Sequence, residues 1–424
     1  MCAITAFRGA ARQVAWGVSL CALLFLSAQS AAAGEVRLSD LIHEALENSP
    51  ELKAINAGVS AARYRIPQAQ SLEDPKVSVG YQNDGFDRLN YGESKDSQWQ
   101  VSASQLLSYP GKRALKGEIA AKEAENAEAS SQIARYTTIF RVTGLYYDLF
   151  LAYKVIDLLQ DRGALYGRIE DAAAARYSSG TGSQQEVLLA QTEKYLIRER
   201  AETQRQRIQT AEALLNAALG RDAVQPLGKP IEPVTHPFAY SLGEAIRLGL
   251  ANSHLIIAKE KLVQAAEARV QLAKKEYYPD VTVSANYAAR GGVEKDMWSV
   301  ATQINIPLYY QTKQRPALFE AEALLAQAKS ETEATKLAVS STIQDSYATV
   351  KTAERQMDLY KNGLIPKTSQ DIEAGLSAYA TGNVEELRVI TSLKALIDYE
   401  TLYWEQFAAR EKAINRITTI AEIE

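Results

Sequence analysis

Four short segments of the chain alternate apolar and polar residues with a period of two, which is typical of β-strands with two different faces. They lie near 76–83, 98–107, 281–290 and 298–306. Each runs to about ten residues, the length that a tilted strand needs to cross a bilayer. The pattern therefore favours membrane-crossing strands over the alternative, a half-buried soluble hairpin. Aromatic residues gather near the segment ends, as in the interfacial girdles of membrane barrels: Tyr81, Trp99, Tyr109, Tyr287, Trp298 and Tyr309.

The stretch that follows the second segment has the three- and four-residue apolar spacing of long packed helices. It contains no proline between 111 and 225, and Gly180 and Gly182 divide it. We expect helices at about 113–177 and 184–219, and at 1.5 Å per residue the first would reach about 95 Å.

The pattern returns after the fourth segment, and it predicts helices from 317 to 378 and from 384 to 419. Pro366 lies inside the first of these and predicts a kink or break there, because proline removes a helical hydrogen bond. The fold class is thus mainly α-helical with membrane β-strands.

The chain is an internal duplication. Segment 38–79 aligns without gaps onto 242–283, and fourteen of the 42 positions are identical, including an Asn-Ser pair and a Val-x-Val. Glycine and proline cluster near 220–240 and mark the joint. We expect a first helix, strand-pair and helix unit at 34–230 and a second at 231–424.

Residues 1–33 have the features of a secretory signal peptide: Arg8 and Arg12, then an apolar run, then Ala31-Ala32-Ala33. Both cysteines of the chain, Cys2 and Cys21, fall in this segment. The remainder therefore has no disulfide. It carries 45 basic and 51 acidic residues, a balance that does not suit a nucleic-acid partner.

Sequence signatures of catalysis and of cofactor binding are absent. The chain has no phosphate-binding glycine-rich loop, zinc signature or nucleophile elbow. Its three histidines are scattered, so no metal site is expected. We therefore expect neither an enzyme nor a cofactor.

Four strands cannot close a membrane barrel, and open strand edges are not tolerated in lipid. If the strands cross a membrane, several chains must contribute to one barrel. Because small membrane barrels have about eight strands or more, two or three chains with four strands each would be enough.

Several motifs together resemble the TolC-type outer-membrane efflux family, and the similarity spans nearly all of the chain after residue 33. They are the Ala-Leu-Glu-Asn-Ser-Pro-Glu-Leu helix (45–52), the Asp74-Pro75 and Pro279-Asp280 strand starts, the Pro110-Gly111-Lys112-Arg113 exit and the Tyr-x-x-Gly turns at 177–180 and 379–382.

The resemblance implies a homotrimer in the outer membrane. Its twelve-stranded β-barrel, four strands from each chain, would continue into a long α-helical coiled-coil barrel in the periplasm. Family members form the outer-membrane channel of a tripartite efflux system, with a periplasmic adaptor (membrane fusion) protein and an inner-membrane pump. The strand at 74–80 and the exit at 109–113 look most like members that serve heavy-metal cation pumps; small toxic compounds are the other expected substrate.

The resemblance also places the two Tyr-x-x-Gly turns at the periplasmic tips, where members close the tunnel and meet the adaptor. Some members carry an aspartate ring past the second turn, but Arg388 and Thr391 stand there in this chain. Glu385 and Glu386 are the nearest acids; the alternative is an exposed helix start whose glutamates favour the helix dipole. The candidate gate and adaptor-contact residues are Gly180, Gly182, Gln184, Gln185, Glu186, Gly382, Glu385, Glu386 and Arg388.

Two other protein classes have long helices. A periplasmic coiled-coil adaptor would also contain glycine-rich β-domains, which the sequence does not show. A soluble structural scaffold would not need two strand pairs flanked by aromatic residues.

Overall fold

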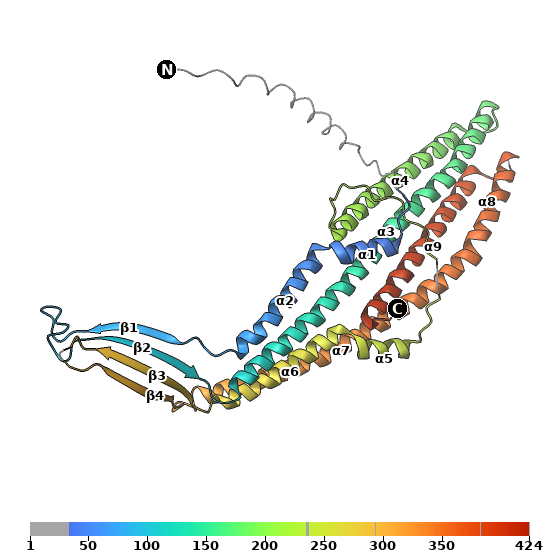
Figure 1. The fold of residues 1–424 in the computed structure, drawn as a ribbon. Coiled ribbons are helices and arrows are strands. Elements are labelled where there is room, and N and C mark those ends of the chain that lie inside the picture. The colour runs from blue at the N-terminus through green and yellow to red at the C-terminus, as the bar shows by residue number, and fades with distance from the viewer. Residues whose placement is uncertain (1–33, 235–236, 293, 382, 424) are drawn as a thin grey trace, which may run out of the picture.

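The computed structural model describes residues 34–234, 237–292, 294–381 and 383–423. The expected signal peptide at 1–33 and the candidate tip residue Gly382 lie outside the described residues. The described chain is long and narrow, with a β-sheet at one end and two helix turns at the other (Figure 1). None of its helices is long and apolar enough to cross a membrane.

The same series of elements occurs twice along the chain. The first series consists of α1 (Leu38–Asn48), α2 (Pro50–Gln70), β1 (Lys76–Gln82), β2 (Gln98–Leu107), α3 (Lys112–Ser178) and α4 (Gln184–Leu219). The second consists of α5 (Leu242–Asn252), α6 (His254–Lys275), β3 (Asp280–Ala289), β4 (Met297–Asn305), α7 (Gln314–Asp358), the π-helix η1 (Leu359–Leu364), α8 (Ile365–Ala380) and α9 (Glu386–Ala421).

The α-helix expected over 317–378 is interrupted beside Pro366, as the sequence predicted, but the interruption is a π-helix rather than a gap in the helical path. The six residues of η1 join α7 to α8, and Pro366 lies in the first turn of α8. Proline has no backbone N–H to donate, and a π-helical turn changes the hydrogen-bond spacing so that the helix continues past it.

The four strands form one antiparallel sheet in the order β1-β2-β3-β4. The register aligns the apolar positions of all four strands: Val79 pairs with Val101, Val101 with Tyr287, and Tyr287 with Trp298. The neighbouring row holds only small polar residues: Ser78, Ser102, Asn286 and Ser299. Because side chains alternate between faces, one face of the sheet is apolar and the other polar.

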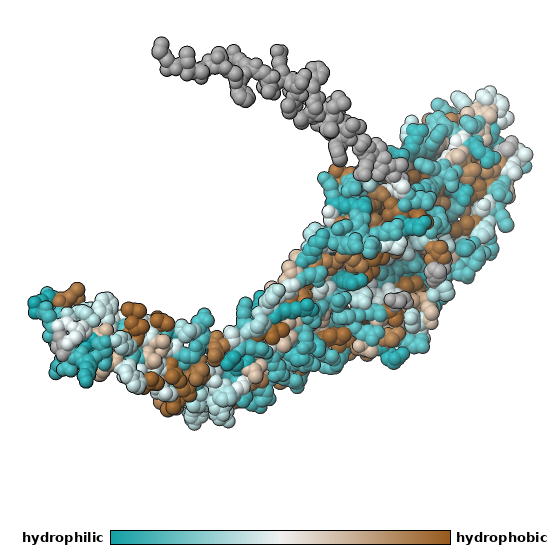
Figure 2. Space-filling view, in the orientation of Figure 1, coloured by the Kyte–Doolittle hydropathy of each residue, from teal (hydrophilic) through white to brown (hydrophobic). Residues whose placement is uncertain are grey.

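The apolar face is exposed in the single chain. Val79 is 66% exposed, Val300 63% and Trp298 77%. Figure 2 shows clusters of hydrophobic residues among polar ones over the strands on the face in view. Among the described residues, no strand pairs with the outer edge of β1 or of β4.

Aromatic packing and ion pairs join the helices of the two series. Tyr147 and Phe150 of α3 pack against Trp404 and Phe407 of α9. Further along α3, Arg162 forms a two-pronged ion pair with Glu400 of α9 at 2.9 and 2.5 Å. Such planar pairs fix orientation as well as distance, so the two series form one helical body.

A buried lysine joins the sheet to the helices. Only 3% of the Lys112 side chain is exposed, and its Nζ donates to Glu276 Oε2 at 3.1 Å and Asp280 Oδ1 at 3.0 Å. It also donates to the Tyr278 carbonyl at 3.1 Å. The start of α3 is thereby tied to the end of α6 and the start of β3.

Candidate functional site

The turn between α3 and α4 depends on two glycines for different reasons. Gly180 has φ +74°, a conformation that other residues reach only with strain. At Gly182 a Cβ atom would lie 2.8 Å from the Cβ atom of Arg176. The Arg176 carbonyl accepts hydrogen bonds from Thr181 N at 2.9 Å and Gly182 N at 3.0 Å. The turn is therefore tight, and two of its backbone hydrogen bonds end on the Arg176 carbonyl.

The second turn connects α8 to α9. Asn383 N donates to the Ala378 carbonyl at 2.9 Å, and Glu385 precedes the first residue of α9 in an extended conformation. Among the described residues no side chain caps the start of α9. By contrast, Ser183 and Glu186 form a reciprocal capping box at the start of α4.

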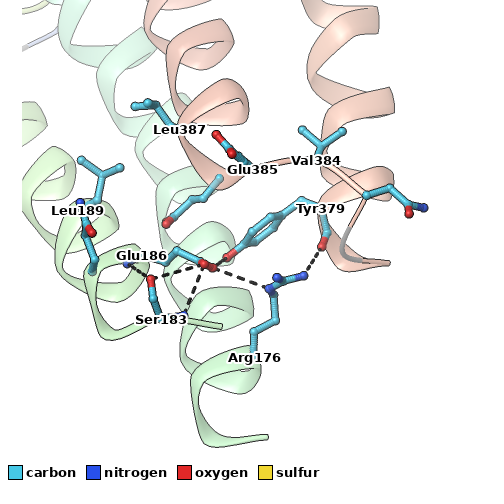
Figure 3. Close-up of a pocket in the computed structure, with 11 residues that line it drawn as sticks. Arg176, Ser183, Glu186, Leu189, Tyr379, Val384, Glu385 and Leu387 are labelled. Carbon is cyan, nitrogen blue, oxygen red and sulfur yellow. Dashed lines mark hydrogen bonds and ion pairs between the residues drawn. The ribbon is translucent and has the colours of Figure 1, made fainter. Parts of the chain in front are cut away.

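Three side chains tie the two turns together (Figure 3). The Tyr379 hydroxyl donates to Glu186 Oε2 at 3.0 Å. Arg176 Nη1 donates to the Tyr379 carbonyl at 3.0 Å, and its Nε lies 3.6 Å from Glu186 Oε2. Burial and the bond to Glu186 raise the pKa of Tyr379, so its hydroxyl stays a donor at neutral pH. We call Arg176, Glu186 and Tyr379 the tip cluster.

Glu386 lies beside the tip cluster but makes none of its bonds. The residue is 2% exposed, and neither carboxyl oxygen has a hydrogen-bond partner among the described residues. Burial and the neighbouring Glu186 charge raise its pKa to about 7, while Arg176 acts in the opposite direction. Glu386, Glu186, Arg176 and Tyr379 line one cavity of about 460 Å³ between the turns.

The other candidate tip residues stay at the surface. Gln184 and Gln185 are exposed at the start of α4, and Glu385 is exposed before α9. Arg388 is exposed too, and its Nη2 lies 3.8 Å from Asp371 Oδ1 of α8. The structure therefore brings Glu186 and Glu386 together and leaves these four outside the contact.

The aromatic candidates fall at the two ends of the sheet. Tyr81 and Trp99 pack at 5.1 Å beside the β1–β2 loop, and Tyr287 pairs with Trp298 beside the β3–β4 loop. At the helical end Tyr109 stacks on Tyr278 at 4.5 Å. Tyr309, 77% exposed, follows β4. Aromatic side chains thus lie at both ends of the apolar face.

Sequence reasoning missed Arg176 and the burial of Tyr379. The two Tyr-x-x-Gly motifs look equivalent, yet Tyr177 is 51% exposed and Tyr379 only 1%. The only sequence signal for this contact was the basic residue directly before the first motif. That signal is weak, because arginine is common on helices. Among the described residues, no group of three or more His, Cys, Asp or Glu could hold a metal ion.

Solved channel structures share this fold at low sequence identity. The chain is 16% identical to CusC, with 91% of each chain covered and a TM-score of 0.78. It is 19% identical to the outer membrane protein VceC of Vibrio cholerae, covering 91% of this chain and 95% of that one with a TM-score of 0.79. The CmeC outer membrane channel of Campylobacter jejuni is 12% identical, covering 91% and 85% with a TM-score of 0.78.

Sequence comparison assigns the family. Among curated protein sequences no match was found. The model of the outer membrane efflux proteins matches residues 41–221 and 245–412, which together make up most of the chain. The chain therefore belongs to the outer membrane efflux protein family and is an efflux channel of the outer membrane.

Proposed function

We propose that three copies of this chain close a twelve-stranded barrel in the outer membrane and continue it as a helical duct through the periplasm. The observation that carries this proposal is the open sheet, whose apolar face spans all four strands, while no other strand of the described residues pairs with the outer edges of β1 and β4. Lipid offers no hydrogen bonds to a free strand edge, so the edges must pair with other copies. Twelve strands lie within the known range of membrane barrels.

In this arrangement the helix turns lie far from the membrane, at the periplasmic tips. We assign to them the closure of the duct and the contact with a periplasmic adaptor protein, which connects the duct to an inner-membrane pump. The exposed residues Gln184, Gln185, Glu385 and Arg388 are the side chains available for that contact. The chain itself needs no cofactor for this role, because the pump supplies the energy.

The substrate passes through without reaction. We propose small toxic compounds or heavy-metal cations, the latter because of the strand and exit motifs at 74–80 and 109–113. A duct does not have to bind a cation tightly to conduct it, since conduction requires weak binding.

The test is the assembly itself. The full chain is expressed, the outer membrane fraction is isolated, and the protein is run unheated and heated on a denaturing gel. We expect a trimer that converts to monomer only on heating, and ion conductance when the unheated trimer is added to planar bilayers. A soluble periplasmic monomer without conductance would instead support the scaffold or adaptor alternatives and refute the proposal.

A further inference from the structure

Glu386 is an unusual residue at the contact between the two turns. It is the first residue of α9 and is 2% exposed. Both carboxyl oxygens are inaccessible to solvent and have no hydrogen-bond partner among the described residues. Burying an ionised carboxylate in this way is costly, because desolvation is not offset by a bond or a paired charge. A neutral carboxyl group avoids most of that cost.

The charged and titratable groups around Glu386 come from each neighbouring helix. Of the described residues, they are Arg176 of α3, Glu186 of α4, Tyr379 of α8 and Glu385 before α9. Of these, Arg176 is the only cation, and it is engaged with Glu186 and with the Tyr379 and Thr181 carbonyls. Among the described residues that line this cavity, no cation is therefore left to pair with Glu386.

Glu186 already has the donors that Glu386 lacks. Its Oε1 accepts from Ser183 N at 3.3 Å, and its Oε2 accepts from the Tyr379 hydroxyl. The negative charge of Glu186 therefore opposes a second charge on Glu386. When two carboxyl groups lie close together, the one that accepts fewer hydrogen bonds is less stabilised when ionised and therefore stays protonated.

We propose that Glu386 is a proton-binding site that holds the α8–α9 turn against the α3–α4 turn, and that ionisation of Glu386 loosens this contact. The ionised carboxylate is more stable in contact with water, and separation of the start of α9 from α3 and α4 provides that contact. The contacts involved lie within one chain, so the inference does not depend on how copies assemble.

The direction of the pH effect follows from the pKa of Glu386. Burial, and secondly the Glu186 charge, raise that pKa from 4.5 to about 7 in the closed contact. The proton is therefore bound more tightly when the turns are together. The closed contact is most stable below pH 4.5, weakens as the pH rises, and has lost this contribution above about pH 7.

The experiment measures the separation of the turns. Residues 34–424 contain no cysteine, so cysteines replacing the exposed Gln184 and Arg388 can carry a pair of spin labels. Labelled protein that starts after residue 33, and so lacks Cys2 and Cys21, is mixed with excess unlabelled protein, so that each assembly has one labelled chain. Double electron–electron resonance then gives the distance distribution between pH 5 and pH 8.5. We expect a longer-distance population that grows as the pH rises from 5 and stops growing above about pH 7.

Two variants test whether ionisation of Glu386 causes the change in distance between the turns. Glu386→Gln keeps the shape of the side chain and cannot ionise, so it should keep the short-distance population over the whole pH range. Glu373→Gln makes the same change at an exposed position of α8 and should follow the parent protein. A pH-independent parent distribution overturns the proposal, and so does a Glu386→Gln variant that shifts with pH as the parent does. Failure of trimer formation would appear separately, on the unheated gel.

Discussion

An arginine scan of two adjacent positions in β2 tests whether the apolar face of the sheet contacts lipid. Ser102 and Ala103 are the central residues of β2. Ala103 lies in the apolar row with Val77 and Ala285, whereas Ser102 lies in the polar row with Ser78. Ala103→Arg and Ser102→Arg therefore add the same side chain at the same depth on opposite faces.

The expected difference can be worked out from this geometry. An arginine on the lipid face at the bilayer midplane costs about 2–4 kcal/mol. Three copies in one barrel repeat the substitution, so an Ala103→Arg trimer should lose about 6–12 kcal/mol relative to the parent. On the polar face the guanidinium group reaches water, so Ser102→Arg should change stability by less than about 1 kcal/mol per chain.

Urea titration of the protein in lipid vesicles measures the difference, with the heat-modifiable trimer band as readout. We expect Ala103→Arg to shift the midpoint strongly or prevent insertion, and Ser102→Arg to resemble the parent protein. Equal losses in the two variants, or a larger loss for Ser102→Arg, would refute the assignment of the apolar face to lipid.

Three further outcomes follow from the contacts described. Lys112→Met leaves Glu276 and Asp280 near each other without their cation, and thermal unfolding should show a loss of about 3–5 kcal/mol; an unchanged midpoint would contradict the role of this lysine. Tyr379→Phe removes one bond to a carboxylate, about 1.5–3 kcal/mol, and should raise single-channel conductance if the tip cluster holds the duct closed; unchanged conductance would remove it from the gate. Gly180→Ala places a Cβ at φ +74° and should cost about 1–2 kcal/mol, seen as faster proteolysis at this turn than in the parent.

Much of the fold could be predicted because its signals are local. A strand with two different faces shows a period of two, and the register then follows from keeping the apolar residues on one face. Glycine and proline mark helix ends because of their backbone properties: proline has a fixed φ and no N–H, and glycine reaches positive φ without strain. Pro50, in the first turn of α2, is an example. The π-helix before Pro366 was not predicted. A helix can accommodate a proline by a kink, a break or a π-helical turn, and the local sequence does not distinguish these arrangements.

The tip could be located from the sequence but not described. Glu385 and Glu386 are neighbours with the same side chain, yet one is exposed and the other is buried. Which of them turns inward depends on the rotation of α9 against α3 and α4, whose residues lie about 200 positions earlier in the chain. Tyr177 and Tyr379 differ for the same reason. Long-range packing of this kind leaves no local pattern to read.

The difference between the two tips also indicates which of them moves. The start of α4 is stabilised within its own turn by the Ser183–Glu186 capping box. Among the described residues the start of α9 has no side-chain cap, and its first residue is the buried Glu386. Losing a cap commonly costs about 1 kcal/mol. The stability of the first turn of α9 therefore depends on its contact with α3 and α4, whereas the first turn of α4 is also stabilised by its own cap. If the turns separate, the α8–α9 turn should therefore fray and move while the α3–α4 turn keeps its shape, and hydrogen exchange should be faster at 386–389 than at 184–187.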